Sequence, residues 1–73
     1  MPKLPVVTPK KLIKVLKRLG FYHRHSVGSH EVFKHSDGRR TVVAVHGREI
    51  PRGTLLAILD DIKITREELA KLL

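Results

Sequence analysis

The chain contains 73 residues and is expected to form one domain, residues 1–73, near the lower size limit for a self-supporting hydrophobic core. It has no cysteine, which excludes disulfides and cysteine metal ligands. No apolar run approaches the roughly 20 residues of a membrane span. The start lacks the apolar region of a secretory signal, so we expect a cytoplasmic protein without a membrane partner. The formal net charge of +8 predicts a polyanionic partner such as nucleic acid.

The positive charge is concentrated in the first part of the chain. Residues 1–53 carry 12 basic and 3 acidic side chains, whereas residues 54–73 carry 3 basic and 4 acidic ones. Because solubility does not require this asymmetry, we interpret the first two thirds of the chain as the source of a binding face. A basic surface that is merely solvated is the alternative interpretation.

A first helix is predicted from Thr8 onward, after an extended lead-in of seven residues that contains two prolines. Thr8 can cap this helix with its hydroxyl, Pro9 suits its first turn, and Gly20 suits the position after its end. Apolar residues recur along one face at helical spacing, namely Leu12, Ile13, Val15, Leu16 and Leu19. The opposite face carries cations that either RNA contact or simple solvation explains: Lys10, Lys14 and Lys17.

Three strands are predicted in the middle of the chain, over residues 21–27, 30–35 and 41–45. Gly28 and Ser29 separate the first two strands, and Gly38 can take the positive φ of a tight turn before the third. The third segment is rich in β-branched residues, and we expect it to be the central strand.

Helical periodicity returns after residue 53, with apolar residues at Leu55, Leu56, Ile58, Leu59 and Ile62. Thr65 and Glu68 form a capping-box pattern that opens a last short helix. The order α-β-β-β-α, followed by this further helical segment, indicates an α+β fold with a three-stranded antiparallel sheet. We expect the helices to cover one face of the sheet and to leave the other face open to solvent or a ligand.

Motifs for phosphate binding and for metal-dependent phosphoryl transfer are missing from the sequence. The unusual feature is a group of five histidines: His23, His25, His30, His35 and His46. His23 and His25 are two apart in a predicted strand, so they are expected to share a face, where His35 or His46 could complete a zinc site. This is a weak signal, and we expect no metal or other cofactor.

Histidine is also suited to acid–base catalysis near neutral pH. RNA carries its own nucleophile, the 2′-hydroxyl, beside the scissile phosphate, so its cleavage needs no metal. The reaction requires a base, an acid and cationic groups that stabilise the charged transition state. A small basic domain with a well-placed histidine meets these requirements, but the residues alone do not select one of the five histidines.

Several short motifs occur in an order that resembles one known family. They are Gly20-Phe21, Gly28-Ser29-His30, Phe33-Lys34-His35, Val43 to Ile50, and Gly53-Thr54-Leu55. With these motifs, the chain resembles the HicA (YcfA-like) toxins over nearly its whole length. The resemblance implies a fold similar to the double-stranded-RNA-binding domain. It also implies an mRNA-cleaving toxin that a HicB-type antitoxin holds inactive. We expect DNA to be contacted only through an antitoxin complex.

The resemblance further implies that His30, the histidine of the Gly-Ser-His motif, is the catalytic residue. Ser29 could orient His30 or donate to a phosphate oxygen, although turn chemistry explains it equally well. His46 could be a second proton donor or a structural group at the end of the third strand. The small residue Gly28 would let the RNA backbone approach closely. The candidate phosphate contacts are Arg24, Lys34, Arg39 and Arg40.

Two other functions remain open from the sequence. The first is a non-catalytic RNA-binding module of the same fold, although residues 53–58 lack the lysine cluster with which duplex-RNA binders usually begin their second helix. The second is an interaction protein that is inert alone and acts only in an antitoxin complex. An acidic antitoxin surface would be attracted to the basic face.

Overall fold

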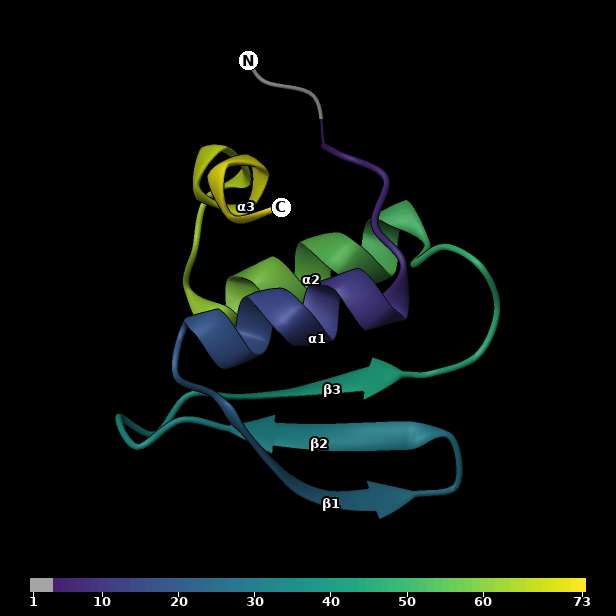
Figure 1. Ribbon diagram of the computed structural model, residues 1–73, viewed down its shortest axis with the longest axis vertical. Helices are drawn as coiled ribbons and strands as arrows, with labels where there is room; N and C mark the ends of the chain where they lie inside the picture. The colour runs from purple at the N-terminus through teal and green to yellow at the C-terminus, as the bar shows by residue number, and fades with distance from the viewer. Residues whose placement is uncertain (1–3) are drawn as a thin grey trace.

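Six elements follow one another in the computed structural model, which describes residues 4–73 (Figure 1). They are α1 (Pro9–Arg18), β1 (Tyr22–Val27), β2 (His30–Lys34), β3 (Arg40–Ala44), α2 (Arg52–Ile62) and α3 (Arg66–Leu72). Residues 1–3, the first part of the predicted lead-in, lie outside the described residues. The α+β class and the order of elements predicted from the sequence are confirmed. The likeness to the double-stranded-RNA-binding domain stays a prediction.

The caps predicted for α1 are present. Thr8 Oγ1 accepts the N–H of Lys11 at 3.3 Å, and Gly20 takes a φ of 92° directly after the C-cap residue Leu19. The N–H of Phe21 donates to the carbonyl of Leu16 at 2.9 Å, a pattern typical of helices that end at a glycine. This turn redirects the chain, and the side chain of Phe21 becomes part of the core.

The sheet is an antiparallel meander in the order β1-β2-β3. β2 is therefore the central strand, and the expectation that residues 41–45 form it is wrong. Short turns join consecutive strands, so the second strand lies between the other two. The β-branched run in β3 reflects burial against α1 and α2, since Thr41 and Val43 are buried on the side of the sheet where these helices pack.

The strand register sorts the side chains onto two faces. Phe33 pairs with Thr41, whose hydroxyl donates to Asp61 of α2 at 3.1 Å, so this face carries the helices. Val32 points to the opposite face: it is buried, but it does not belong to the core cluster. One face of the sheet is therefore left without helices, as predicted.

A bulge in β1 changes the placement of two histidines. His23 pairs with Phe33 and His25 pairs with Val32, so the register shifts between the two histidines. Because Phe33 and Val32 point to opposite faces, His23 and His25 do so as well. The expectation that these imidazoles share a face is wrong, which removes the basis for a zinc site there. Within residues 4–73, no three His, Asp or Glu side chains are grouped so as to hold a metal ion.

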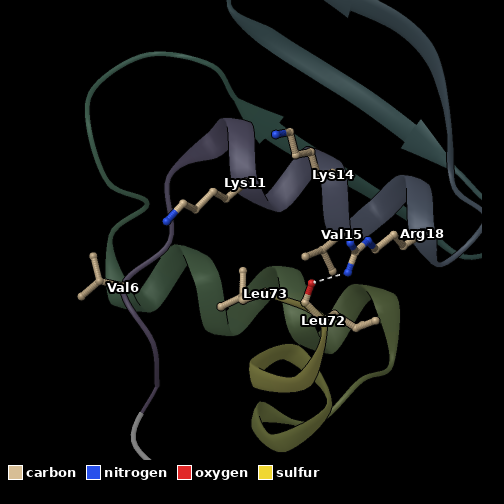
Figure 2. A pocket seen from close by; sticks show the side chains of 7 residues that line it. All are labelled: Val6, Lys11, Lys14, Val15, Arg18, Leu72 and Leu73. Carbon is tan, nitrogen blue, oxygen red and sulfur yellow. Dashed lines mark hydrogen bonds between the residues drawn. The ribbon is translucent and has the colours of Figure 1, made fainter.

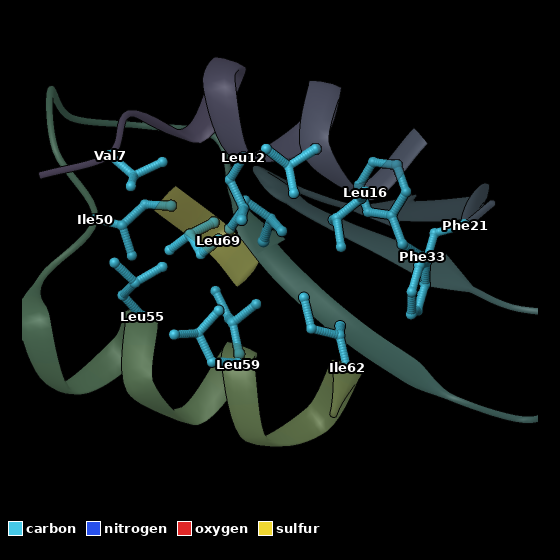
Figure 3. Packing of buried hydrophobic residues seen from close by; sticks show 13 residues of the cluster. Val7, Leu12, Leu16, Phe21, Phe33, Ile50, Leu55, Leu59, Ile62 and Leu69 are labelled. Atoms are coloured by element: carbon cyan, nitrogen blue, oxygen red, sulfur yellow. The ribbon is translucent and has the colours of Figure 1, made fainter. Parts of the chain in front are cut away.

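The helices close a hydrophobic core over the covered face of the sheet (Figure 3). Leu69 of α3 joins this core, and the capping box that opens α3 is present. Glu68 N–H donates to Thr65 Oγ1 at 3.1 Å, and Thr65 N–H donates to Glu68 Oε1 at 3.0 Å. β1 lies farthest from the helices, and all of its residues are exposed (Figure 1). In residues 4–73 no helix has the length and apolar character needed to span a membrane.

Candidate active site

The pairing of β2 with β3 brings two histidines together. His30 opens β2 and pairs with Ala44 at the end of β3, so the residues that follow β3 lie beside the start of β2. The N–H of Val45 donates to the carbonyl of Ser29 at 2.8 Å and holds this end of β3 on the β1–β2 turn. The His30 and His46 rings are nearly perpendicular, with centroids 6.4 Å apart, and both side chains are exposed. This pair is the candidate active site.

The turn before His30 is short and open. Gly28 and Ser29 form a two-residue loop between the paired residues Val27 and His30, and Gly28 has a φ of 60°. A positive φ at the first loop residue suits a tight hairpin and disfavours a side chain. A Cβ at Gly28 would meet no atom within 4 Å, so the backbone conformation, and not crowding, favours glycine. The turn therefore leaves room for a substrate beside the exposed Ser29 and His30.

The predicted phosphate contacts Lys34 and Arg40 lie on the open face of the sheet. They are cross-strand partners, and alternation along β2 places Lys34 on the same face as His30. They lie at the other end of the strand, about 13 Å from His30 at the usual rise per residue. Arg24 is exposed at the β1 bulge. The structure thus places these cations along the sheet and not around His30 itself.

Arg39, the fourth predicted phosphate contact, binds within the chain. Its guanidinium donates to Asp37 at 2.8 Å and to the carbonyl of Ile62, and it lies 5.0 Å from the centroid of the Phe21 ring. These contacts tie the β2–β3 turn to the end of α2 and hold the guanidinium against the core. We therefore leave Arg39 out of the proposed phosphate contacts.

His35 is also used by the fold. Its Nδ1 accepts the backbone N–H of Asp37 at 3.1 Å, so its Nε2 is free to donate to the carbonyl of Leu19 at 3.0 Å. The ring packs edge-on against Phe21, and a Cβ at Gly20 would lie only 3.0 Å from Nε2. His35 therefore stabilises the junction between α1 and β1.

A polar cluster on β1 and β2 was not predicted from the sequence. His23 Nε2 lies 3.1 Å from both Ser26 Oγ and Glu31 Oε2, and Ser26 also donates to Glu31. The His23 ring packs edge-on against Phe33, with 5.5 Å between the ring centroids. The pairing of Ser26 with Glu31 follows from the predicted hairpin. The bulge that brings the His23 side chain to the same face as this pair has no local sequence signal.

Hydrogen bonds from Ser26 and then His23 hold the pKa of the Glu31 carboxyl below its ordinary value of 4.5. Because folding lowers this pKa, the cluster stabilises the hairpin at pH values above the ordinary pKa of the carboxyl. This stabilisation is lost as the pH falls through the folded-state pKa. We expect Ser26→Ala to raise the titration midpoint of Glu31 toward the ordinary value, as measured by NMR of the carboxyl carbon. An unchanged midpoint in this variant would show that the Ser26 hydrogen bond is not the main cause.

A hollow adjoins His46 where β3, the following loop and α2 meet. Its polar lining consists of His46, Glu49 and Thr54. Its apolar lining consists of Pro9, Val43, Ala44, Ile50, Pro51 and Ile58. The candidate active site therefore has a mostly apolar recess beside one of its two histidines.

These features define a small basic α+β domain with two adjacent exposed histidines at one end of its sheet, His30 at the start of β2 and His46 in the loop after β3. The sequence model described as the HicA toxin of bacterial toxin–antitoxin systems matches residues 9–64, which include both histidines. The chain therefore belongs to the HicA toxin family. Membership supports a toxin role and implies, in general terms, a cognate antitoxin and an RNA target. No curated protein matches the chain in sequence.

Proposed function

We propose that this protein is a metal-independent endoribonuclease that cleaves single-stranded mRNA in the cytoplasm. His30 is its catalytic histidine, and a HicB-type antitoxin neutralises it by covering the open face of the sheet. The observation that carries the proposal is the pair of exposed histidines at one end of the sheet, in a member of a toxin family.

The proposed reaction needs only the RNA and two imidazoles. One imidazole removes the proton of the 2′-hydroxyl, and the 2′-oxygen attacks the adjacent phosphorus. The bond from phosphorus to the 5′-oxygen breaks as the second imidazole, in its protonated form, gives that oxygen a proton. The products are a 2′,3′-cyclic phosphate and a free 5′-hydroxyl. A centroid separation of 6.4 Å lets both rings reach one phosphodiester, since each contact needs about 3 Å between heavy atoms.

The open face offers contacts for the rest of the RNA strand. Lys34 and Arg40 bind phosphates away from the scissile bond, and Arg24 adds positive charge at the bulge. Tyr22, which is 50% exposed and pairs with Lys34, provides a ring on which a base can stack. The recess beside His46 lies among β3, the following loop and α2, at the edge of the sheet and not on its open face, and it provides space for a nucleoside next to the scissile phosphate. Together these groups suit a single strand lying across the sheet.

The proposal is tested by incubating the purified protein with a mixed-sequence single-stranded RNA in EDTA. We expect cleavage in EDTA, because no metal takes part in the reaction, and fragments that end in a 2′,3′-cyclic phosphate, because the 2′-oxygen is the nucleophile. A protein that binds the RNA with the salt dependence of phosphate contacts, but leaves it intact, would be a non-catalytic RNA-binding module. That result would overturn the proposed ribonuclease.

His46 is proposed as the partner of His30 in proton transfer. The rate of the wild-type protein should follow a bell-shaped pH profile, as expected for one general base and one general acid. We expect His46→Ala to lower kcat by about 100-fold and to remove one limb of this profile. A variant that keeps both limbs and changes only KM would show that His46 contacts the substrate without transferring a proton.

A further inference from the structure

A groove between α1 and α3 combines an apolar surface with positive charge (Figure 2). It is lined by Val6, Lys11, Lys14, Val15, Arg18, Leu72 and Leu73. Arg18 donates to the carbonyl of Leu72 at 3.1 Å, which holds the end of α3 against α1. In Figure 1, α3 and the sheet lie on opposite sides of α1 and α2. The groove is therefore separate from the candidate active site.

The cations of the groove form one row on α1. Lys11, Lys14 and Arg18 are three and four residues apart, so they lie on the same side of the helix. All three are exposed, and within residues 4–73 none forms a salt bridge with an acidic side chain. Lys11 stands in the first turn, where the helix macrodipole disfavours a cation. Helix stability and the bond to Leu72 account for Arg18 in the last turn, but not for Lys11 and Lys14, so we attribute the charge of these two lysines to binding.

The apolar part of the groove argues for a peptide partner. Val15 is buried, whereas Val6 and Leu73 are 71% and 47% exposed. Val6 and Leu73 are two of the five large hydrophobic side chains that are exposed among the described residues. An RNA backbone would use the cations but would gain nothing from this apolar surface. A helix that carries both acidic and apolar side chains matches both parts of the groove.

We propose that the groove receives an acidic amphipathic helix of the cognate antitoxin. The row from Lys11 to Arg18 spans two turns, about 10 Å along α1, so carboxylates one and two turns apart on the incoming helix would face it. Apolar side chains of that helix would cover the exposed Val6 and Leu73. The antitoxin would then hold the toxin by a contact that does not itself cover His30. This inference rests on the antitoxin partner in the proposed function and not on RNA cleavage.

The test uses the full chain with labelled methyl groups and a synthetic helical peptide about four turns long, with leucine and glutamate along one face. We expect saturable NMR shifts at the methyl groups of Val6, Val15, Leu72 and Leu73, while the His30 ring signals stay unchanged. Two control peptides carry lysine in place of glutamate or serine in place of leucine. Each should bind roughly tenfold more weakly or worse.

Charge reversal on α1 provides a second readout. Lys11→Glu/Lys14→Glu should weaken binding of the acidic peptide roughly tenfold and strengthen binding of the lysine peptide. Lys10→Glu/Lys17→Glu is the matched control, because it changes the net charge equally on the same helix but outside the groove lining. This control should keep the affinity for the acidic peptide within about twofold.

Three results would overturn the proposal. The first is the absence of shifts at the groove methyl groups. The second is equal binding of the serine peptide, or shifts spread over the whole basic surface, which would indicate general charge attraction. The third is the same set of methyl shifts with a single-stranded RNA, which would assign the groove to nucleic acid. None of these measurements depends on RNA cleavage, so the proposed binding groove and the proposed ribonuclease activity are tested independently of each other.

Discussion

Replacing His30 with alanine is expected to lower the rate of RNA cleavage by about 100- to 10,000-fold, the range for loss of one general acid or base. His30 is exposed at the start of β2, and its strand pairing uses backbone groups, so the variant should keep the fold. Its unfolding temperature should therefore stay close to that of the wild type. The rate is measured with a fluorogenic single-stranded RNA in EDTA, and the unfolding temperature by circular dichroism.

His25→Ala is the matched control for this experiment. His25 is another exposed histidine, and its pairing with Val32 places it on the open face that also carries His30. Its loss should change the cleavage rate by no more than a few fold. Full activity in His30→Ala would exclude His30 from the reaction. An equally large loss in both variants would indicate a general effect of the histidine-rich face and would contradict the assignment of His30.

Phe33→Ala is expected to destabilise the protein by about 3–5 kcal/mol. Phe33 lies in the central strand, is 2% exposed and fills the core between the sheet and the helices (Figure 3). A chain of this length has a total stability on the order of 4–11 kcal/mol, so this one side chain supplies much of it. The Tm should fall by roughly 12 °C or more.

The loss is measured by urea denaturation of the wild type and Phe33→Ala. Val27→Ala serves as the control, because Val27 is 64% exposed on β1 and its truncation should change the stability by no more than about 0.5 kcal/mol. A loss below about 1 kcal/mol in Phe33→Ala would contradict the packing described for this ring.

The helices and turns were predictable because their signals are local. Thr8 and Thr65 accept hydrogen bonds from backbone groups three residues further along, so neighbouring residues suffice to mark both helix starts. Gly38 takes the positive φ expected for its turn. The first strand begins at Tyr22 and not at Phe21, because the N–H of Phe21 is used in the turn that ends α1.

The candidate site was predictable only in part. The family motif singled out His30, whereas residue spacing did not distinguish it from the other four histidines. The closeness of His46 to His30 comes from the pairing of β2 with β3. The sequence did not indicate that Arg39 is held against the core, because its partners, Ile62 and Phe21, are distant in the sequence.

By itself, the sequence determined the order of helices and strands, the excess of positive charge and the family, because these follow from periodicity, caps, composition and motifs. Only the tertiary structure decided which strand is central, on which face each histidine lies and that Arg39 is held against the core. The physical reason is that strand register and bulges depend on packing between residues far apart in the chain. A shift of one residue in a strand moves a side chain to the opposite face of the sheet.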